Sequence, residues 1–567
     1  MKKIFIFILF AIAGLFYSCN EDRFVIQPKG QAAAETFSSK QGVNVLLIGA
    51  YAVVDGTVSA NNNVAPSSVS NWVFGSAMSD EAYKGSEVNG EVDMNPIEGF
   101  YVDATNPYIN TRWVNYYDGI VRTNDVLRVI PTATDMTTAE KTLAAAQAKF
   151  LRAHFYFELT TVYSKVPYID ENTNNPGEVT NDHVLWPEIE ADMKFAVENL
   201  PPSWSDKGRV TQWAAKTYLA RIYMFQKKFA DAKPLLQDVY THGGFTLVPS
   251  YEMNFMIANN NNEESIWEIQ YAVNDGASMS SNAGNGDGWN FPHSVAGMGT
   301  CCGGFQPSHN LVSAFKVDAN GLPLLDDTYS EDDIVPFSPT GATVSYTGPV
   351  DPRLDWAIGR PGVPYLDWGI HKGNGWNIDP SYGGPYLNKK SMFKKSEKNI
   401  FSNTTGWRSG LNANNFRKYR LAHVILWLAE CEAESGSLQN ATALVNEIRN
   451  RVKNSNVVTF DDGTPAANYQ VEPYSSDFPS KDYALKAIRY EIRLEFALEG
   501  LRFFDLVRWG IAGSVMNNYL DVESTIMPHL AGRVFTPGQS EIWPIPQRQI
   551  DLSVKAGKSV LTQNPGY

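Results

Sequence analysis

The side chains able to do chemistry are few, and their spacing fits no common catalytic centre. The chain has eight histidines, and no two are four residues apart, as zinc ligands on successive turns of one helix would be. Gly299, Cys301 and Gly303 match the G-x-C-x-G pattern of a nucleophile elbow. That elbow lies between a strand and a helix, whereas residues 282–307 have the composition of a glycine-rich loop, so we expect no catalytic cysteine.

Carboxylate pairs are common in a chain with 61 acidic residues. Glu430 and Glu432, and likewise Glu495 and Glu499, lie in segments with helical periodicity. We expect these acids to pair with Arg451, Arg493 or Arg502 and not to form a hydrolytic acid–base pair. No P-loop occurs, and Gly284, Gly286 and Gly288 lack the strand-then-helix context of a dinucleotide site. The sequence therefore predicts a protein that is not an enzyme, with no cofactor, although loop oxygens leave a structural calcium open.

Aromatic side chains in loops suggest binding without bond making. Aromatic residues make up 12% of the chain, with 14 Trp, and such rings stack on the apolar faces of sugars. Amides and charged groups beside them would bond to hydroxyls and orient the ligand. The competing interpretation of each aromatic residue is a loop anchor in the core. The candidate ligand-binding residues are Trp72, Asp80, Glu81, Tyr83, Lys84, Trp289, Asn290, Phe291, Trp376 and Trp407.

The start of the chain predicts export. Lys2 and Lys3 precede a short apolar run, residues 4–16, which is typical of a signal peptide and too short to span a bilayer. Residues 15–19 (LFYSC) resemble a bacterial lipobox, so we expect residues 1–18 to be the signal peptide and Cys19 to be lipidated. Residues 19–40 would then form the lipidated cysteine and a flexible tether.

The other cysteines form no disulfide framework. Cys431 lies in a helical pattern and is expected to be an inert core thiol. Cys301 and Cys302 are adjacent and can be either a vicinal disulfide in an oxidising compartment or two reduced thiols. The net charge of −14 argues against a nucleic-acid partner and against an anionic lipid surface.

Helical periodicity dominates four zones of the chain. We expect single helices over residues 113–130 and 139–163, and helix pairs over 211–240 and 419–451. The two pairs, with turns at residues 226–228 and at Gly436, resemble tetratricopeptide units. Between them lie segments rich in Gly, Asn, Pro, Ser and Trp, which we expect to be ordered functional loops because of their aromatic content. These segments are residues 55–110, 272–310 and 339–416.

Four separated segments together resemble the SusD/RagB family. They are residues 113–124 (WVNYYDGIVRTN), 148–159 (AKFLRAHFYFEL), 492–510 (IRLEFALEGLRFFDLVRWG), and the closing motifs 543–546 (WPIP) and 563–567 (QNPGY). Together they span nearly the whole mature chain. His154 departs from the bulky apolar residue that is common in the family, which affects local packing more than function.

The resemblance implies a mostly α fold, a tetratricopeptide-like scaffold of helical pairs with long loop-rich insertions, over residues 41–567. Its N-terminal part would cover about 41–250 and its C-terminal RagB/SusD part about 260–567. The resemblance also implies a lipid-anchored outer-membrane protein facing the cell exterior, which captures oligosaccharide or polysaccharide for a SusC-like TonB-dependent transporter. Two alternatives stay open: a peptide-capturing, RagB-like member, and a protein-interaction scaffold without a small ligand.

Overall fold

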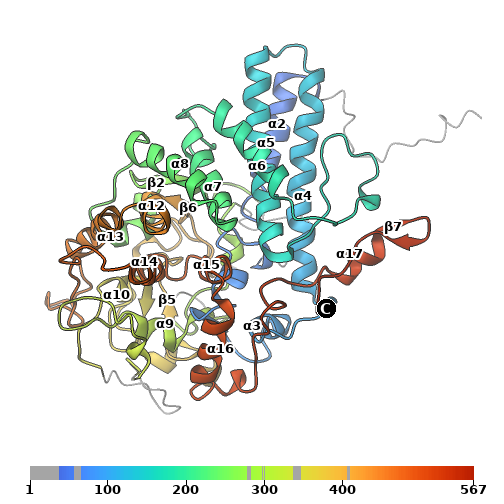
Figure 1. The fold of residues 1–567 in the computed structure, drawn as a ribbon. Coiled ribbons are helices and arrows are strands. Elements are labelled where there is room, and N and C mark those ends of the chain that lie inside the picture. The colour runs from blue at the N-terminus through green and yellow to red at the C-terminus, as the bar shows by residue number, and fades with distance from the viewer. Residues whose placement is uncertain are drawn as a thin grey trace, which may run out of the picture.

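Helices dominate the regular secondary structure, as the sequence predicts, and strands are few and short (Figure 1). The computed structural model describes residues 37–56, 65–277, 282–295, 298, 301–331, 333–335, 346–404 and 409–567. The expected signal peptide, Cys19 and most of the expected tether lie outside these residues. No helix in the described part of the chain is both long enough and apolar enough to cross a membrane.

Ten longer helices and six short ones lie in the described residues. The longer helices are α2 (Lys40–Tyr51), α4 (Pro107–Val129), α5 (Thr138–Tyr163), α6 (Trp186–Asn199), α7 (Gln212–Phe225), α8 (Phe229–His242), α12 (Leu421–Ser435), α13 (Leu438–Lys453), α14 (Lys481–Glu495) and α16 (Ala512–Glu523). The short helices are α3 (Asn95–Glu98), α9 (His309–Ala314), α10 (Arg353–Ala357), α11 (Pro380–Gly383), α15 (Arg502–Trp509) and α17 (Gln547–Leu552).

Eight short strands form four antiparallel two-stranded ribbons in the described residues. The pairs are β1 (Ala82–Gly85) with β3 (Gly304–Pro307), β2 (Ser265–Ile269) with β6 (Phe416–Arg420), β4 (Ile358–Gly359) with β5 (Leu387–Asn388), and β7 (Val554–Lys555) with β8 (Lys558–Ser559). Two of these ribbons join segments that are far apart in the sequence, and both bear on the site described below.

Local sequence signals set the helix boundaries. Thr137 caps α5 through a capping box with Glu140, which satisfies backbone N–H groups that the first turn leaves free. The predicted helix over residues 113–130 begins earlier, at Pro107, because Asn106 caps it and proline suits the first helical position. The two predicted helix pairs are confirmed as α7 with α8 and α12 with α13.

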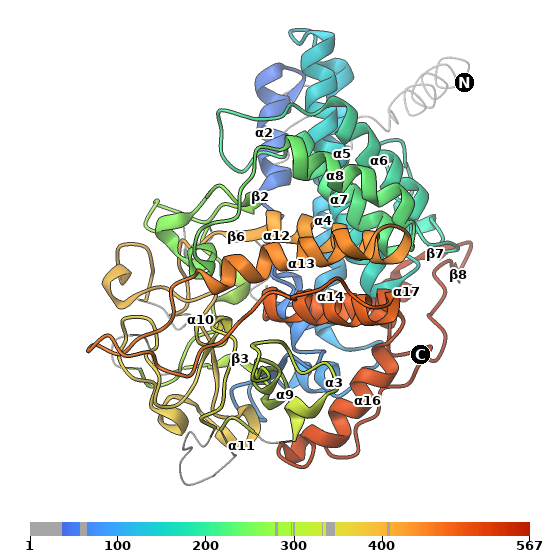
Figure 2. The ribbon, with the colours of Figure 1, turned by 60° about the vertical axis from the view of Figure 1, so that its left-hand side comes forward.

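Helices that are far apart in the sequence are neighbours in the helical stack. Along the stack α4 packs on α5, α5 on α6, α6 on α7 and α7 on α8. The next contact of α8 is with α12, which in turn packs on α13 and α14. Figure 2 shows α12, α13 and α14 lying side by side beneath α7 and α8. The two helix pairs are therefore neighbours in space, and the chain between α8 and α12 forms one long insertion.

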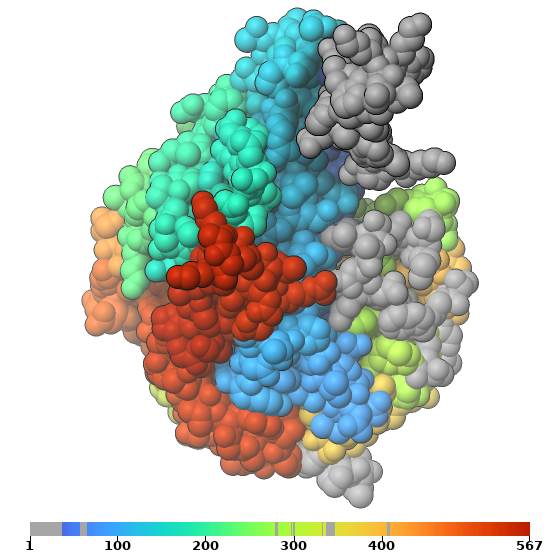
Figure 3. Space-filling model, turned by 90° about the vertical axis from the view of Figure 1, so that its right-hand side faces the viewer, coloured from blue at the N-terminus to red at the C-terminus, as the bar shows by residue number. Residues whose placement is uncertain are grey.

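The β2·β6 ribbon closes the base of that insertion. Ser265 pairs with Arg420 and Ile269 with Phe416, so the start and the end of the loop-rich segment meet beside the helical stack. A second link ties the C-terminal segment to α5, since Trp543 N–H donates to the Val162 carbonyl, 2.8 Å away. Figure 3 shows the C-terminal segment lying against the N-terminal one on one face of the molecule.

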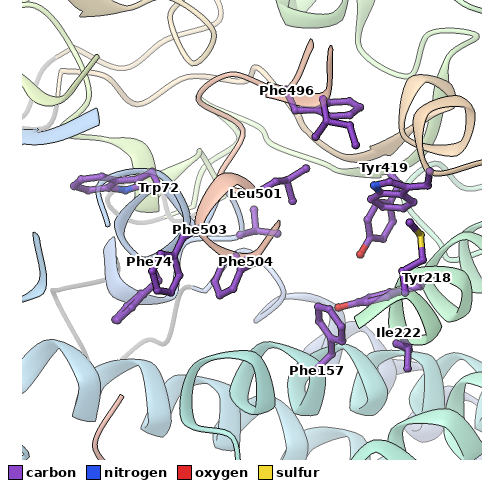
Figure 4. Close-up of a cluster of buried hydrophobic side chains, with 14 of the residues drawn as sticks. Trp72, Phe74, Phe157, Tyr218, Ile222, Tyr419, Phe496, Leu501, Phe503 and Phe504 are labelled. Atoms are coloured by element: carbon purple, nitrogen blue, oxygen red, sulfur yellow. The ribbon is translucent and has the colours of Figure 1, made fainter. Parts of the chain in front are cut away.

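A hydrophobic core runs through the scaffold and into the loops. It includes side chains from Val43 in α2 to Leu561 near the C-terminus. Figure 4 shows Trp72 and Phe74 on one side of this core, near Phe503 and Phe504, and Tyr218 with Tyr419 on the other. His154 lies in the same interior, where its Nδ1 is 2.9 Å from the Tyr218 hydroxyl. Burial lowers the pKa of His154 to about 3, so its imidazole is neutral at ordinary pH.

One buried carboxylate, Glu495, connects four elements. Its Oε2 accepts from Arg353 in α10 at 3.0 Å, and its Oε1 accepts from Arg420 in β6 at 2.6 Å and from Arg451 in α13. Burial alone raises the pKa of Glu495, but the three arginines outweigh it and hold that pKa well below its usual range. Glu495 is thus a charged anchor between the insertion and the helical stack.

The expected pairing of the scaffold acids with Arg451, Arg493 or Arg502 is confirmed for Glu495, which contacts Arg451. Glu430 pairs with a different arginine, Arg508, in a bidentate contact with both N–O distances at 2.8 Å. The partners of the other two acids differ: Glu499 contacts Lys390 and Arg420, and Glu432 contacts Lys233. Cys431, which lies between Glu430 and Glu432 in α12, is confirmed as a buried free thiol.

Removing the charge of Glu495 is expected to destabilise the fold strongly. In Glu495→Gln three buried arginines lose their shared anion, which costs about 3–5 kcal/mol of unfolding free energy. The matched control is Glu472→Gln, because Glu472 forms an exposed pair with Lys453 worth about 0–1 kcal/mol. Denaturant unfolding followed by tryptophan fluorescence measures both. Equal losses in the two variants would contradict the role assigned to Glu495.

Candidate functional site

The β1·β3 ribbon joins two loops that sequence reasoning had treated separately. Tyr83 pairs with Gln306 and Gly85 with Gly304, so residues 82–85 run antiparallel to 304–307. Beyond the ribbon, Ser86 N–H donates to the Gly303 carbonyl at 2.7 Å. The left-handed φ of +77° at Gly85 lets the chain turn away there. The segments on either side of the ribbon diverge and leave a pocket between them.

This pocket has a volume of about 420 Å³ and lies at the end of the ribbon. One wall comes from the end of β1 and the residues after it, and the other comes from described residues before β3 and at its start. The lining residues are Trp72, Lys84, Ser86, Glu87, Gly90, Glu91, Met94, Trp289, His293, Cys301, Cys302, Gly304 and Ile378. Its size and its mixture of apolar surface with a few polar groups are typical of a small-ligand site.

The polar groups of the pocket differ in how many hydrogen bonds they already make within the protein. Lys84 Nζ donates to the Glu87 carbonyl at 2.9 Å and to the Gly90 carbonyl, so it braces the loop. Burial lowers the pKa of Lys84 to about 8. The Glu91 carboxylate accepts from the Tyr108 hydroxyl, whereas the Glu87 side chain lies at the exposed rim. His293 Nδ1 is buried without a hydrogen-bond partner among the described residues.

Cys301 and Cys302 form a vicinal disulfide in this wall. Of the two states that the sequence leaves open, the structure has the oxidised one. Both residues are partly exposed, and both line the pocket. The same two side chains pack against a second hydrophobic cluster, described below, on their inner side. The disulfide is therefore a surface feature of the pocket and not a staple between distant segments.

Three of the ten candidate residues line this pocket: Trp72, Lys84 and Trp289. Trp72 is 1% exposed, and its Nε1 donates to the Gly286 carbonyl at 2.8 Å. Its ring lies 5.5 Å from that of Phe305, so most of this side chain belongs to the core. Trp289 is 9% exposed, so it presents more surface than Trp72 does. Trp289 is therefore the better candidate for a stacking surface.

Asp80, Glu81 and Tyr83 lie in the interior, beneath the ribbon. Asp80 accepts from Arg502 Nε and Nη2, both at 2.8 Å, and pairs with Arg493 at 3.1 Å. Burial raises the pKa of Asp80, but the two arginines outweigh burial and lower it to about 2. Because all three side chains are 2% exposed or less, the structure gives them a role in holding the ribbon and not a contact with ligand.

The internal partners of Glu81 and Tyr83 support that assignment. Glu81 accepts from the Ser76 hydroxyl at 2.7 Å, and burial raises its pKa to about 7. Tyr83 donates to Glu523, which also accepts from His309 N–H at 2.9 Å. Burial raises the pKa of Glu523 to about 7 as well. These bonds fasten β1 to α9 and α16.

Phe291 and Trp376 belong to the second hydrophobic cluster, inside the loop insertion. The cluster consists of Ile257, Phe291, Val295, Met298, Tyr365, Trp368, Trp376, Leu387, Met392 and Phe393. Trp376 is 4% exposed and packs 5.0 Å from the His371 ring. Asn290 is also buried and donates to Asp287 at 3.2 Å. Loop anchoring explains these three residues, and Trp407 lies outside the described residues.

Sequence reasoning missed the rest of the pocket wall. Glu87, Met94, His293 and Ile378 were not candidates, although all four lie within ten residues of one. Their proximity follows from the β1·β3 pairing, which no local pattern predicts. Among the described residues, no group of three or more His, Cys, Asp or Glu side chains is placed to hold a metal ion.

A larger cavity, of about 710 Å³, lies between α14 and α16. Arg493 and Arg502 line it, but both are paired with Asp80. Arg489 lies over the Trp509 ring at 5.2 Å. Arg493 and Arg502 are therefore committed to the scaffold. The pocket beside the β1·β3 ribbon is the better candidate, because Trp289 lines it and His293 Nδ1 has no hydrogen-bond partner there among the described residues.

Asp80 is expected to make stability depend on acid. Its pKa is lowered on folding, so its contribution is complete above the unfolded value near 3.9 and is lost as pH falls toward about 2. Between pH 6 and pH 3 the wild type should lose about 1 kcal/mol more unfolding free energy than Asp80→Asn. Denaturant titrations at pH 6, 4 and 3 compare the two proteins. Parallel pH profiles would contradict the Asp80 ion pairs.

Comparison with curated proteins finds SusD-like relatives. The chain is 31% identical over 189 residues to a SusD-like protein of Bacteroides ovatus, an alignment covering 30% of this chain and 34% of that one. It therefore spans about a third of that relative's length. A second SusD-like protein, from Formosa agariphila, is 23% identical over 537 residues, which cover 91% of this chain and 90% of the relative.

The fold agrees with solved structures. Surface glycan-binding protein A from Bacteroides thetaiotaomicron, in complex with laminarihexaose, superposes with a TM-score of 0.63 at 21% identity, over 93% of this chain and 99% of that one. A family model described as starch-binding associating with outer membrane matches residues 26–224. The model of the SusD family matches residues 263–567, more than half of the chain. The chain belongs to the SusD family.

Proposed function

We propose that this protein captures glycans in the pocket at the end of the β1·β3 ribbon. The observation on which the proposal rests is the pairing of apolar wall and free polar groups in that pocket. Trp289, Met94 and the disulfide supply apolar surface, and Glu87 and His293 supply groups that can bond to hydroxyls. A sugar presents the same combination, an apolar ring face bordered by hydroxyls. The structural neighbour in complex with laminarihexaose supports the same ligand class.

We infer binding without hydrolysis. Glycosidases place two carboxyl groups on opposite sides of the scissile bond, one of them a buried general acid. The two carboxylates of this pocket are differently arranged: Glu91 is bonded to Tyr108, and Glu87 is exposed at the rim. Neither is a buried acid facing the pocket, so the arrangement favours reversible capture of an intact glycan.

Two other functions compete with glycan capture. A peptide-binding member would need backbone donors and acceptors along an extended groove. A pure protein scaffold would leave the pocket empty. The compact pocket, with its indole wall and one buried, unpartnered imidazole nitrogen, favours a sugar over either alternative.

We further propose that the protein works at the cell surface. The apolar run and lipobox-like residues before Cys19 support a lipid anchor in the outer membrane. The family description of a starch-binding protein associating with the outer membrane supports the same location. In this arrangement the protein faces outward and delivers its glycan to a SusC-like TonB-dependent transporter.

Glycan capture predicts a defined loss in Trp289→Ala. The lipid-free protein, residues 20–567, is expected to be retarded in gels containing one polysaccharide of a panel, and Trp289→Ala should weaken that binding about tenfold or more. The matched control is Trp213→Ala, since Trp213 lies on α7 outside the pocket. Thermal unfolding of each variant checks its fold. Retention of binding by Trp289→Ala would contradict the site, and calorimetric binding of peptides without any glycan retardation would favour the peptide alternative.

The membrane role predicts two properties of the protein purified from detergent-solubilised outer membranes. Mass spectrometry should find the processed N-terminus at Cys19 with acyl chains attached, and a TonB-dependent barrel protein copurifying. Cys19→Ser should move the protein out of the membrane fraction, because both the thioether and its acyl chains are lost. A Cys19→Ser variant that fractionates with the membrane would contradict lipid anchoring, and purification without a barrel protein would contradict the transporter complex.

A further inference from the structure

The Cys301–Cys302 disulfide lies in the pocket wall, where its redox state could affect the pocket. Disulfides that stabilise folds join distant segments and shorten the loops of the unfolded chain, but this one joins neighbours whose Cα atoms are 3.7 Å apart. Constraint of the unfolded state therefore cannot be its main effect. It lies instead in the wall of the candidate pocket, partly exposed, with Trp289 and His293 in the same lining.

We propose that the Cys301–Cys302 ring is itself a contact surface for the sugar, and that its reduction switches the pocket to a weaker binding state. The proposal rests on glycan capture at this pocket, as proposed above. A closed disulfide ring has no hydrogen to donate, and its sulfurs are weak acceptors with a polarisable, apolar surface. Such a surface suits the apolar face of a sugar, and Trp289 offers a second one in the same pocket.

The backbone around the ring is held in a conformation that the disulfide helps to maintain. Cys302 has a φ of +79°, and Gly303 follows with a φ of +73°. Left-handed backbone is unfavourable for a residue with a side chain, so Cys302 needs a constraint to stay there. Closure of the ring supplies that constraint. Opening it frees both side chains to rotate and allows Cys302 to leave the left-handed region.

Movement at the ring would reach both walls of the pocket. Gly303 accepts from Ser86 N–H at 2.7 Å, and Gly304 N–H donates to the Trp289 carbonyl at 3.1 Å. The residues directly after the ring are thus bonded to Ser86, which follows β1, and to the backbone of Trp289. On their inner side the cysteines pack against the second hydrophobic cluster. Reduction would therefore alter the apolar contact and loosen the loop that positions Trp289.

The switch is a balanced dithiol–disulfide exchange. An external dithiol attacks one sulfur, forms a mixed disulfide, and then closes its own disulfide. The dithiol supplies the two electrons that reduce the sulfur–sulfur bond of the ring and is itself oxidised to a disulfide, and its two protons end on the two released thiols. The reverse reaction with an oxidised dithiol restores the ring. Cys431, the free thiol in α12, is buried, and burial raises its pKa to about 12, so it is a poor competitor for this exchange.

The test compares glycan binding by oxidised and reduced protein, using the polysaccharide that retards the lipid-free chain. Treatment with dithiothreitol, with mass spectrometry after alkylation to count free thiols, should weaken binding about tenfold. The variant with both Cys301→Ser and Cys302→Ser should bind as weakly and no longer respond to dithiothreitol. The control Cys431→Ser should respond as the wild type does. Unchanged affinity in protein whose ring is shown to be open would overturn the proposal.

A second measurement separates direct contact from an indirect effect on the loop. Saturating glycan should slow the opening of the ring by dithiothreitol about fivefold or more, because a bound sugar covers the sulfurs that the thiolate must reach. An unchanged rate would overturn the contact. The outcomes also separate this proposal from the function on which it rests. Binding that persists after reduction defeats the redox switch alone, whereas a wild type that binds no glycan defeats both.

Discussion

The buried charge of Glu495 is the constraint around which the molecule is organised. An isolated carboxylate in a protein interior is strongly unfavourable, and three arginines from separate elements compensate for it. Each arginine in turn needs an anion, so Arg353 also contacts Asp351 and Arg420 also contacts Glu264. The arrangement is satisfied only when α10, β6, α13 and α14 are all in place. It therefore fixes the loop insertion against the helices with a specificity that apolar packing alone does not give.

That attachment explains how long loops can hold a binding pocket. Loops without internal structure rarely keep side chains in fixed positions, but this insertion has its own hydrophobic cluster and the β2·β6 ribbon at its base. The β1·β3 ribbon also ties its middle to residues 82–85. The β1·β3 ribbon brings residues near 85 and near 304 together, and the Asp80 ion pairs hold it from below. The pocket is thus a rigid gap between braced loops. Its lining residues can differ in identity without changing the scaffold beneath them.

The sequence predicted the scaffold well, because local signals specify it. Apolar spacing along α5 and the turns between α7 and α8 and between α12 and α13 are short-range features, and the structure has them near the expected residues. The candidate site was predicted only in part. Trp72 and Trp376 are loop tryptophans that turned inward, since a loop with its own core also needs large apolar residues. The partners of the pocket, such as Glu87 and His293, depend on long-range pairing that composition and periodicity do not encode.

The same long-range pairing has a consequence for the order in which the molecule can form. The α4–α8 helices pack through contacts close in sequence and can assemble while the rest of the chain is still arriving. The pocket cannot form early, because Tyr83 bonds to Glu523 in α16, and α5 bonds to Trp543 in the C-terminal segment. The first helices can therefore form a bundle early, whereas the two halves of the pocket stay apart until almost the last residues of the chain are available. The pocket is thus completed late and abruptly, and partly folded intermediates lack it.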